Sequence, residues 1–254
     1  MKRVRYRTFT GVRWGELNGG YIEELSGMMG IPTGNHVPLS DVSLLPPCEP
    51  QNIVCVGRNY VGHIRELGNL TGQDLPQEPG LFLKGTNTIS GTGDDIPYPS
   101  FTNNLHYEGE LAVVISRTMR NITPDEATEY ILGYTGALDI TARDVQRSDL
   151  QWVRAKSADG FCPIGPWIET ELDPANVRIQ TRVNGEVRQD GTTADMIFPV
   201  PEILAYISSF MTLQPGDVVL TGTPEGVGTI TSGDEIELEI EGIGTLMNRV
   251  AERS

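Results

Sequence analysis

The sequence predicts an α+β protein in which strands outnumber helices and form a strongly curved, mostly antiparallel or mixed sheet. The chain of 254 residues contains 29 glycines and 17 prolines without a repeat, an excess that is typical of many turns between short strands. Most of the periodic segments are short apolar or alternating runs bounded by turn residues, which indicates strands. These segments do not alternate strictly with helices, so a doubly wound parallel sheet is not expected.

Composition and charge narrow the range of partners. Aspartate and glutamate number 34 against 19 lysines and arginines, giving a formal charge of −15. A nucleic-acid binder needs a basic surface, so we expect no nucleic-acid partner, and an anionic ligand would need local positive charge. No apolar run approaches the ~18 residues of a membrane span, and the N-terminus lacks the apolar core of a secretory signal. We therefore expect a cytoplasmic protein without a membrane partner.

The three cysteines, Cys48, Cys55 and Cys162, have no CxxC spacing, so we expect neither a disulfide framework nor a thiolate zinc site. Residues 1–48 are predicted to form a small β-rich N-terminal domain. Short strand-like segments there are separated by turn signals, of which Asn18-Gly19 is the strongest because both residues tolerate positive φ.

Residues 49–254 are predicted to form the larger domain, after a proline-rich linker at 45–50. A continuous apolar run at 52–57 is typical of a buried strand, and a polar, glycine-rich stretch with a short helix near 60–67 follows it. The remaining strands are expected at 81–85, 106–116, 217–222 and 235–242, with a hairpin over 177–191 that turns at Asn184-Gly185.

Two helices carry start signals. Thr123 is a candidate N-cap, Pro124 suits the first helical position, and Glu126 completes a capping box, so a helix is expected from here to about Gly133. A second helix is expected from Pro201, with one apolar face made by Ile203, Leu204, Ile207, Phe210 and Met211.

Glu108 and Glu110 are the first candidates for chemistry. On a strand, residues i and i+2 share a face, which would place their carboxylates roughly 6–7 Å apart, with His106 beside them. Residues 111–115 are apolar on both faces, so these charges would enter the core, where a hard divalent cation could neutralise them. The glutamates of 235–241 instead alternate with isoleucine and leucine, which is typical of a strand with one solvated face.

Four further features leave a structural and a functional interpretation open. Asp139 could be a third oxygen ligand or a turn residue, and Lys156 could be a surface lysine. His63 and Glu66, at i and i+3, could be a solvated pair or a dyad in which the carboxylate raises the basicity of the imidazole. The glycine-rich loop at 221–228 could be a tight turn or a close backbone approach to a ligand.

Seven segments, taken together and in order, resemble the fumarylacetoacetate hydrolase family. They are GRNYVGHIRELG, LFLKGTNTISG, HYEGELAVVIS, GALDITARDVQ, RAKSADGFCPIGPW, VNGEVRQDGTTADMIF and GDVVLTGTPEGVG. The resemblance covers residues 50–250, and residues 1–48 resemble the small N-terminal domain of many bacterial members. Within the family, the sequence is most similar to bacterial 2-hydroxyhepta-2,4-diene-1,7-dioate isomerases and 5-oxopent-3-ene-1,2,5-tricarboxylate decarboxylases. Gly85 stands where many members carry a proline.

The resemblance implies a site and a fold. Its metal ligands fall on Glu108, Glu110 and Asp139, with Mg²⁺ (or Mn²⁺) as the cofactor, and its lysine near the metal falls on Lys156. The implied fold is a curved, mixed β-sandwich-like roll with a small N-terminal β-rich domain, assembled as a homodimer. The His–Glu pair of a mobile lid, within residues 58–80, falls on His63 and Glu66. The remaining residues of the implied site bind substrate: Arg58, Arg143, Gln146 and Thr223.

The implied reaction is an isomerisation or decarboxylation of a 2-oxo or 2-hydroxy-dienoic dicarboxylic acid through a metal-stabilised enolate, in homoprotocatechuate catabolism. Lys156 would add positive charge beside the developing enolate, and Arg143 or Arg58 would pair with a remote substrate carboxylate. Two alternatives remain: hydrolysis of a C–C bond in an acylpyruvate or fumarylacetoacetate-type substrate, or decarboxylation of oxaloacetate. A non-catalytic binding protein on the same scaffold is disfavoured because the whole set of implied ligands and Lys156 is intact.

Overall fold

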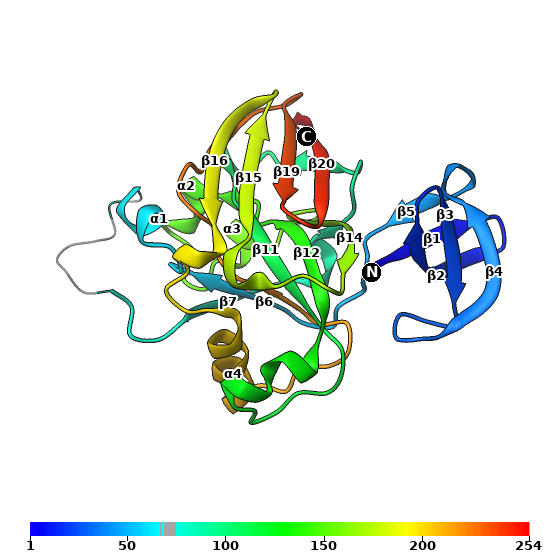
Figure 1. Ribbon diagram of the computed structural model, residues 1–254. Helices are drawn as coiled ribbons and strands as arrows, with labels where there is room; N and C mark the ends of the chain where they lie inside the picture. Colours follow the sequence, from blue (N-terminus) through cyan, green and yellow to red (C-terminus); the bar gives the residue numbers. More distant parts are fainter. Residues whose placement is uncertain (67, 69–74, 254) are drawn as a thin grey trace.

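The computed structural model describes residues 1–66, 68 and 75–253, and within these residues the protein is mostly β, as the sequence predicts (Figure 1). Three sheets are present among the described residues, with twelve, five and three strands. Each sheet contains neighbouring strands that are far apart in the sequence, and the two larger sheets contain both parallel and antiparallel strand pairs. The prediction of an α+β fold with a mixed sheet is confirmed.

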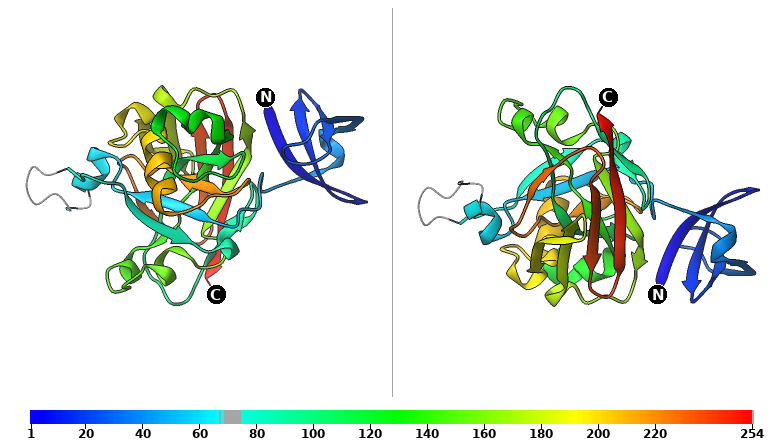
Figure 2. Two further views of the ribbon diagram at one scale, coloured as in Figure 1. Left: turned by 90° about the horizontal axis from the view of Figure 1, so that it is seen from below. Right: turned by 90° about the horizontal axis from the view of Figure 1, so that it is seen from above.

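The first 45 residues form an antiparallel meander around a small core of Val4, Tyr6 and Ile22. The turn predicted at Asn18-Gly19 joins two paired strands, and Gly19 has φ of +59°. The first strand also pairs with a strand of the main body through Lys2 and Glu169. Figures 1 and 2 show this unit at one end of the molecule. Its strands are β1 (Lys2–Thr8), β2 (Gly11–Asn18), β3 (Tyr21–Leu25), β4 (Pro32–Pro38) and β5 (Ser43–Leu45).

The centre of the large sheet carries the site. Its strands lie in the order β14, β12, β11, β17, β6 and β7, and β11 is buried along its whole length. The strands predicted at 52–57, 81–85 and 217–222 are present, and the parallel pairing of β17 with β6 brings two of them together. The bounds are β6 (Ile53–Gly57), β7 (Gly80–Lys84), β11 (Gly109–Ile115), β12 (Ile131–Leu138), β14 (Cys162–Glu169) and β17 (Val218–Leu220).

A second sheet packs its apolar face against the first. Leu238 and Ile240 of this sheet share one buried cluster with Leu111 and Val113 of β11. The predicted hairpin is confirmed, because Asn184 and its neighbouring glycine both adopt positive φ at its turn. This sheet contains β9 (Asp95–Tyr98), β15 (Arg178–Val183), β16 (Glu186–Thr192), β19 (Glu235–Ile240) and β20 (Gly244–Arg253).

The two carboxylate-bearing segments differ as the sequence predicts, although the geometry of one of them was predicted incorrectly. In β19, Glu235 and Glu239 are exposed, whereas the apolar residues that alternate with the glutamates are buried: Ile236, Leu238 and Ile240. The strand expected at 106–116 is interrupted at Glu108, because β10 (Leu105–Tyr107) leaves the large sheet and pairs with β13 (Thr141–Ala142) and β18 (Gly228–Ile230). Glu108 therefore occupies a junction between two sheets, and His106 lies on the three-stranded one.

The first predicted helix is shorter than expected. The Thr123 capping box is present, but the helix is a 3₁₀ helix, η3 (Pro124–Tyr130), and β12 begins at Ile131. Pairing with β11 and β14 on both sides overrides the local helical pattern. The second helix, α4 (Val200–Phe210), buries three of the predicted apolar residues but leaves Phe210 58% exposed. Phe210 has the predicted spacing along the helix but is not part of its buried face.

Short helices and turns complete the chain. The helix expected near 60–67 is α1 (Val61–Glu66), which lies at the opposite end of the molecule from the N-terminal strands (Figure 2). The other short helices are α2 (Arg143–Gln146), α3 (Val153–Lys156) and the 3₁₀ helices Leu39–Asp41, Thr86–Thr88, Pro174–Asn176 and Thr193–Asp195. The short strand β8 (Ile89–Ser90) pairs with β14. No helix in the described part of the chain is long and apolar enough to cross a membrane. The three cysteines are buried and free.

Candidate active site

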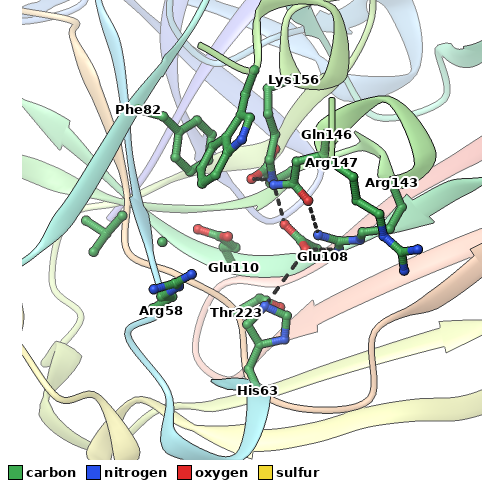
Figure 3. Close-up of a pocket in the computed structure, with 14 residues that line it drawn as sticks. Arg58, His63, Phe82, Glu108, Glu110, Arg143, Gln146, Arg147, Lys156 and Thr223 are labelled. Carbon is green, nitrogen blue, oxygen red and sulfur yellow. Dashed lines mark hydrogen bonds and ion pairs between the residues drawn. The ribbon is translucent and has the colours of Figure 1, made fainter. Parts of the chain in front are cut away.

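A cavity of about 230 Å³ opens beside α1, between the end of β6 and the junction of β10 with β11 (Figure 3). Every residue that the sequence placed in the site lines this cavity, except Glu66. The lining also includes residues that the sequence did not single out: Val56, Gly57, Phe82, Arg147 and Trp152.

Three buried carboxylates converge in this cavity. Glu108 is 4% exposed, Glu110 2% and Asp139 1%, and each offers an oxygen within 4.8 Å of the others. The pairing of β11 with β12 brings them together, because Gly109 lies opposite Leu138, the residue before Asp139. The backbone N–H of Asp139 donates to the Glu108 carbonyl at 2.8 Å, which fixes the relative position of the two segments.

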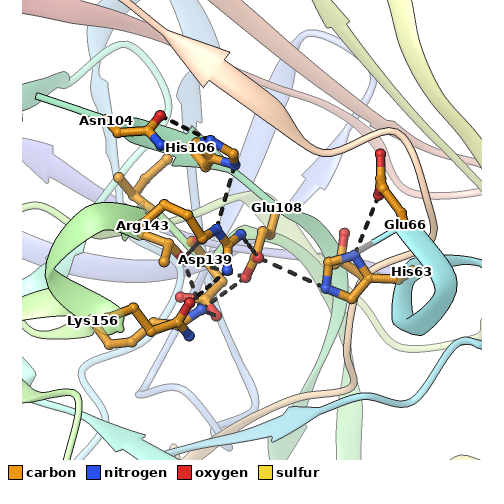
Figure 4. A network of polar contacts seen from close by, with 12 residues as sticks. His63, Glu66, Asn104, His106, Glu108, Asp139, Arg143 and Lys156 are labelled. Atoms are coloured by element: carbon orange, nitrogen blue, oxygen red, sulfur yellow. Dashed lines mark hydrogen bonds and ion pairs between the residues drawn. The ribbon is translucent and has the colours of Figure 1, made fainter. Parts of the chain in front are cut away.

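Two of the carboxylates are neutralised by cationic side chains (Figure 4). Lys156 Nζ donates to Glu108 Oε2 at 2.8 Å and also to Asp139 Oδ2 and Thr141 Oγ1. Arg143 pairs with the other oxygen of Glu108. Burial alone would raise the pKa of Glu108, but Lys156 and Arg143 hold that pKa well below its usual range. Burial would likewise lower the pKa of Lys156, and the two carboxylates raise it instead.

Glu110 is the carboxylate without a cationic partner among the described residues, and its surroundings show whether a cation fits in this cavity. Its Oε2 accepts the backbone N–H of Gly222 at 2.7 Å, and it has no ion pair among the described residues. Burial, followed by the negative charges of Asp139 and Glu108, raises the pKa of Glu110 well above its usual range. A buried carboxylate with two like-charged neighbours and no cationic partner is stabilised by a cation. The donor set is all oxygen, which suits Mg²⁺ or Mn²⁺.

His63 reaches the same cavity from α1. Its Nε2 lies 3.9 Å from Glu108 Oε1, and its Nδ1 lies 3.6 Å from Glu66 Oε2. Burial is the dominant influence and lowers the pKa of His63, so the ring is neutral at neutral pH. Glu66 also accepts the backbone N–H of Gly226 at 3.2 Å, which ties α1 to the glycine-rich loop.

The glycine-rich loop contributes backbone as well as side chain. Thr223 lines the cavity, but its hydroxyl donates to the Gly109 carbonyl at 2.9 Å and accepts the amide of Gln189 at 2.7 Å. Gly222 has φ of +95°, and a Cβ there would meet Asn59 at 2.8 Å. The loop therefore approaches the site closely, and a side chain at Gly222 would prevent that approach.

The arginines of the site differ in how they are engaged. Arg143 is buried between Glu108 and Gln146, whose Oε1 accepts at 2.7 Å. Arg58 is exposed at the cavity wall and adopts φ of +60°, which is uncommon for a residue other than glycine. Of the two arginines that the sequence offered for a remote substrate carboxylate, Arg58 is the one without an acidic partner among the described residues.

Sequence reasoning missed the aromatic wall and a second buried lysine. Phe82 and Trp152 meet edge to face, with ring centroids 5.6 Å apart, and Lys156 Nζ lies 4.7 Å from the Phe82 ring. Lys84, at the end of β7, is buried against Asp139. The only available signal was a charged residue directly after the apolar Leu-Phe-Leu of this strand.

The lid predicted at 58–80 is described only in part. Residues 67 and 69–74 lie outside the described residues, so the mobility expected of this segment stays a prediction. Gly85, which stands where many members of the resembled family carry a proline, has φ of −71° and ψ of 153°, a conformation that proline also adopts. Its N–H, which a proline would lack, donates to Ser157 Oγ at 3.1 Å.

The match to a family model gives the class of this protein, which is a family of enzymes that act on small molecules. Residues 52–251 match the family described as fumarylacetoacetate (FAA) hydrolase C-terminal, and residues 1–47 match one described as Rv2993c-like, N-terminal. The chain belongs to the fumarylacetoacetate hydrolase family, as the sequence resemblance indicated.

Relatives within this family differ in activity. The chain is 47% identical to protein Rv2993c of Mycobacterium tuberculosis, over 87% of this chain and 83% of that protein. It is 43% identical to the mitochondrial oxaloacetate tautomerase FAHD1 of Bos taurus, with coverages of 79% and 91%. It is also 44% identical to a 4-hydroxyphenylacetate degradation bifunctional isomerase/decarboxylase of Salmonella dublin, over 78% of this chain and 46% of that protein.

Solved structures that are similar to this chain also differ in activity. The 2-hydroxyhepta-2,4-diene-1,7-dioate isomerase of Mycobacterium marinum is 42% identical, with a TM-score of 0.91 and coverage of 100% of this chain and 99% of that one. A maleylpyruvate hydrolase of Sphingobium sp. SYK-6, in complex with manganese(II) and pyruvate, is 30% identical, with a TM-score of 0.82 and full coverage of both chains.

Proposed function

We propose that this protein is a Mg²⁺-dependent (or Mn²⁺-dependent) isomerase/decarboxylase of 2-oxo or 2-hydroxy-dienoic dicarboxylic acids in homoprotocatechuate catabolism. One observation carries the proposal: three buried carboxylates converge on one cavity, and one of them lacks a cationic partner among the described residues. The names of the Mycobacterium marinum isomerase and the Salmonella dublin isomerase/decarboxylase support the choice of reaction.

The proposed cation ligands are Glu108, Glu110 and Asp139. When bound, the cation supplies Lewis-acid assistance to a substrate oxygen that gains negative charge. Glu108, Glu110 and Asp139 would supply three carboxylate groups to the cation, and a 2-oxo acid would add its own carboxylate and keto oxygens. The manganese(II) and pyruvate held by the Sphingobium hydrolase support this pairing of cation and 2-oxo acid.

The remaining side chains have distinct proposed roles. Lys156 keeps its ammonium in the cavity and stabilises negative charge on a reacting oxygen. His63 is neutral and accessible from the cavity, so it takes up the proton that the substrate loses and returns it at another carbon. Glu66 orients the imidazole, and Arg58 pairs with the remote carboxylate. Gln146 and Thr223 contact substrate, and Arg143 holds Glu108 in place.

A second candidate function is hydrolysis of a C–C bond in an acylpyruvate or fumarylacetoacetate-type substrate, or turnover of oxaloacetate. The specific observation that favours it is the neutral His63 beside Glu66, because such a pair can also activate a water molecule. The hydrolase and tautomerase names among its relatives support this alternative.

The test is turnover of a substrate panel by the whole protein, with Mg²⁺ and with EDTA. The proposal predicts that the hydroxy-dienedioate is isomerised or decarboxylated fastest and that EDTA stops the reaction. Fastest turnover of an acylpyruvate or of oxaloacetate would establish the second candidate instead. That the protein works as a homodimer in the cytoplasm stays a prediction, which light scattering and fractionation of cells would test.

A further inference from the structure

Lys84 is a buried lysine to which the proposed mechanism gives no role. It is the last residue of β7, where it pairs with Ile53 of β6, and its side chain is fully buried. Its Nζ donates to Asp139 Oδ1 at 2.6 Å and to the Ile140 carbonyl at 3.1 Å. Phe82, two residues earlier on the same face of the strand, lines the cavity, whereas Lys84 lies behind the lining.

The two lysines that contact Asp139 therefore approach it from different sides. Lys156 lines the cavity and donates hydrogen bonds to Asp139 Oδ2, to Glu108 and to Thr141. Lys84 contacts no other carboxylate among the described residues, and both of its hydrogen bonds go to the segment that begins at Asp139. One oxygen of Asp139 is thus held from outside the cavity, and the other is on the cavity side.

We propose that Lys84 is a positioning residue: it holds Oδ1 of Asp139 so that Oδ2 is the oxygen presented to a divalent cation. This inference rests on the proposed function, because it assumes that Asp139 is a ligand. Mg²⁺ requires near-ideal ligand geometry, so a carboxylate fixed from behind binds it better than one free to rotate. Groups that orient metal ligands from outside the coordination sphere typically contribute 10–100-fold to affinity.

The sign of the effect separates positioning from simple charge. Lys84 is positive, so its removal makes the cavity more negative and would by charge alone strengthen cation binding. Loss of the hydrogen bond to Oδ1 acts in the opposite direction. Weaker cation binding by a folded variant without Lys84 therefore points to positioning, because the loss of positive charge alone predicts tighter binding.

The test is calorimetric titration of Mg²⁺ and of Mn²⁺ into the wild-type protein and Lys84→Met, after circular dichroism has shown that the variant folds. Lys84→Met should bind both cations about 10–100-fold more weakly. Lys84→Gln, which keeps a hydrogen-bond donor on a shorter side chain, should lie between them. The matched control is Asn248→Ala, which removes two buried hydrogen bonds of 2.8 Å to Gly91 and Asp94 in another sheet. It should lower Tm and leave both affinities unchanged.

The outcomes are distinguishable. No binding by the wild-type protein would overturn the cation site itself and Lys84's role with it. Equal or tighter binding by Lys84→Met would overturn the role of Lys84 alone. If neither Lys84 variant folds, a crystal structure of the wild-type protein with Mn²⁺ decides. The proposal requires Lys84 Nζ to stay within hydrogen-bond distance of Oδ1 while the cation binds Oδ2, and rotation of Oδ1 onto the cation would contradict it.

Discussion

Two segments of this protein carry glutamates at every second position, but the glutamates of one segment are buried and those of the other face solvent. Glu108 and Glu110 are almost completely buried at the junction of β10 and β11, whereas Glu235 and Glu239 of β19 face solvent. Glu239 meets Arg182 of the neighbouring strand at 2.9 Å, an exposed pair that contributes less than about 1 kcal/mol to stability. The difference lies in the residues between and after the glutamates, because continuous apolar sequence buries a strand and alternating sequence exposes one face.

The largest expected effect comes from removing a buried member of the carboxylate trio. Asp139→Ala or Glu108→Ala should abolish most activity and weaken Mg²⁺ binding by more than about 100-fold, the upper limit for residues that only orient ligands. Initial rates and calorimetry on folded variants measure both quantities. Full activity of Glu108→Ala in the presence of EDTA would contradict the proposal that the buried glutamates, unlike those of β19, bind a cation.

The next effect in size separates binding from proton transfer. His63→Ala should lower kcat by roughly 10²–10⁴ and leave cation affinity nearly unchanged, because the imidazole acts as base and is not a ligand. Glu66→Gln should act in the same direction but less, since Glu66 only orients the ring. A large His63→Ala effect on a dienedioate beside a small one on oxaloacetate would favour isomerase use of the pair. Negligible effects on every substrate would show that the pair takes no part in the reaction.

A smaller effect, an increase in stability in the absence of a cation, is expected from Glu110→Gln. The folded-state pKa of Glu110 is raised, so the free energy of unfolding that it contributes is highest at low pH and falls as pH rises past the usual glutamate range. The amide removes this loss, so the cation-free variant should unfold at a higher Tm than wild type at neutral pH, by about 2–4 °C per kcal/mol regained. Thermal unfolding from pH 5 to pH 8 without cation measures this. A lower Tm at every pH would contradict the burial of an unpartnered charge.

The smallest effect is expected on the exposed strand. Glu237→Ala should change the free energy of unfolding by no more than about 0.5 kcal/mol and should alter neither activity nor Mg²⁺ affinity. It removes the same side chain as Glu108→Ala, from a strand whose glutamates face away from the core. A loss of cation binding in this variant, detected in the same titration, would mean that the overall acidity of the protein attracts Mg²⁺ and not the trio.

How far the sequence predicts the structure depends on whether the deciding contacts are local. The hairpin at Asn184-Gly185 and the capping box at Thr123 are local, and both are present. The end of that helix was predicted incorrectly, because β11 and β14 pair with residues from Ile131 onward and come from distant parts of the chain. Lys84 escaped notice for the same reason, since its partner Asp139 is 55 residues away.

The most direct test of the buried trio as a cation site is a titration of the wild-type protein and Glu110→Gln with Mn²⁺. Calorimetry measures the heat of binding, and the electron paramagnetic resonance signal measures the Mn²⁺ that stays free. Glu110 is the member of the trio that no lysine or arginine among the described residues neutralises, so a bound cation should be its main partner. We expect one Mn²⁺ per wild-type chain, displaced by Mg²⁺, and a much weakened site in Glu110→Gln. Equal Mn²⁺ binding by the two proteins, or none by the wild type, would contradict it.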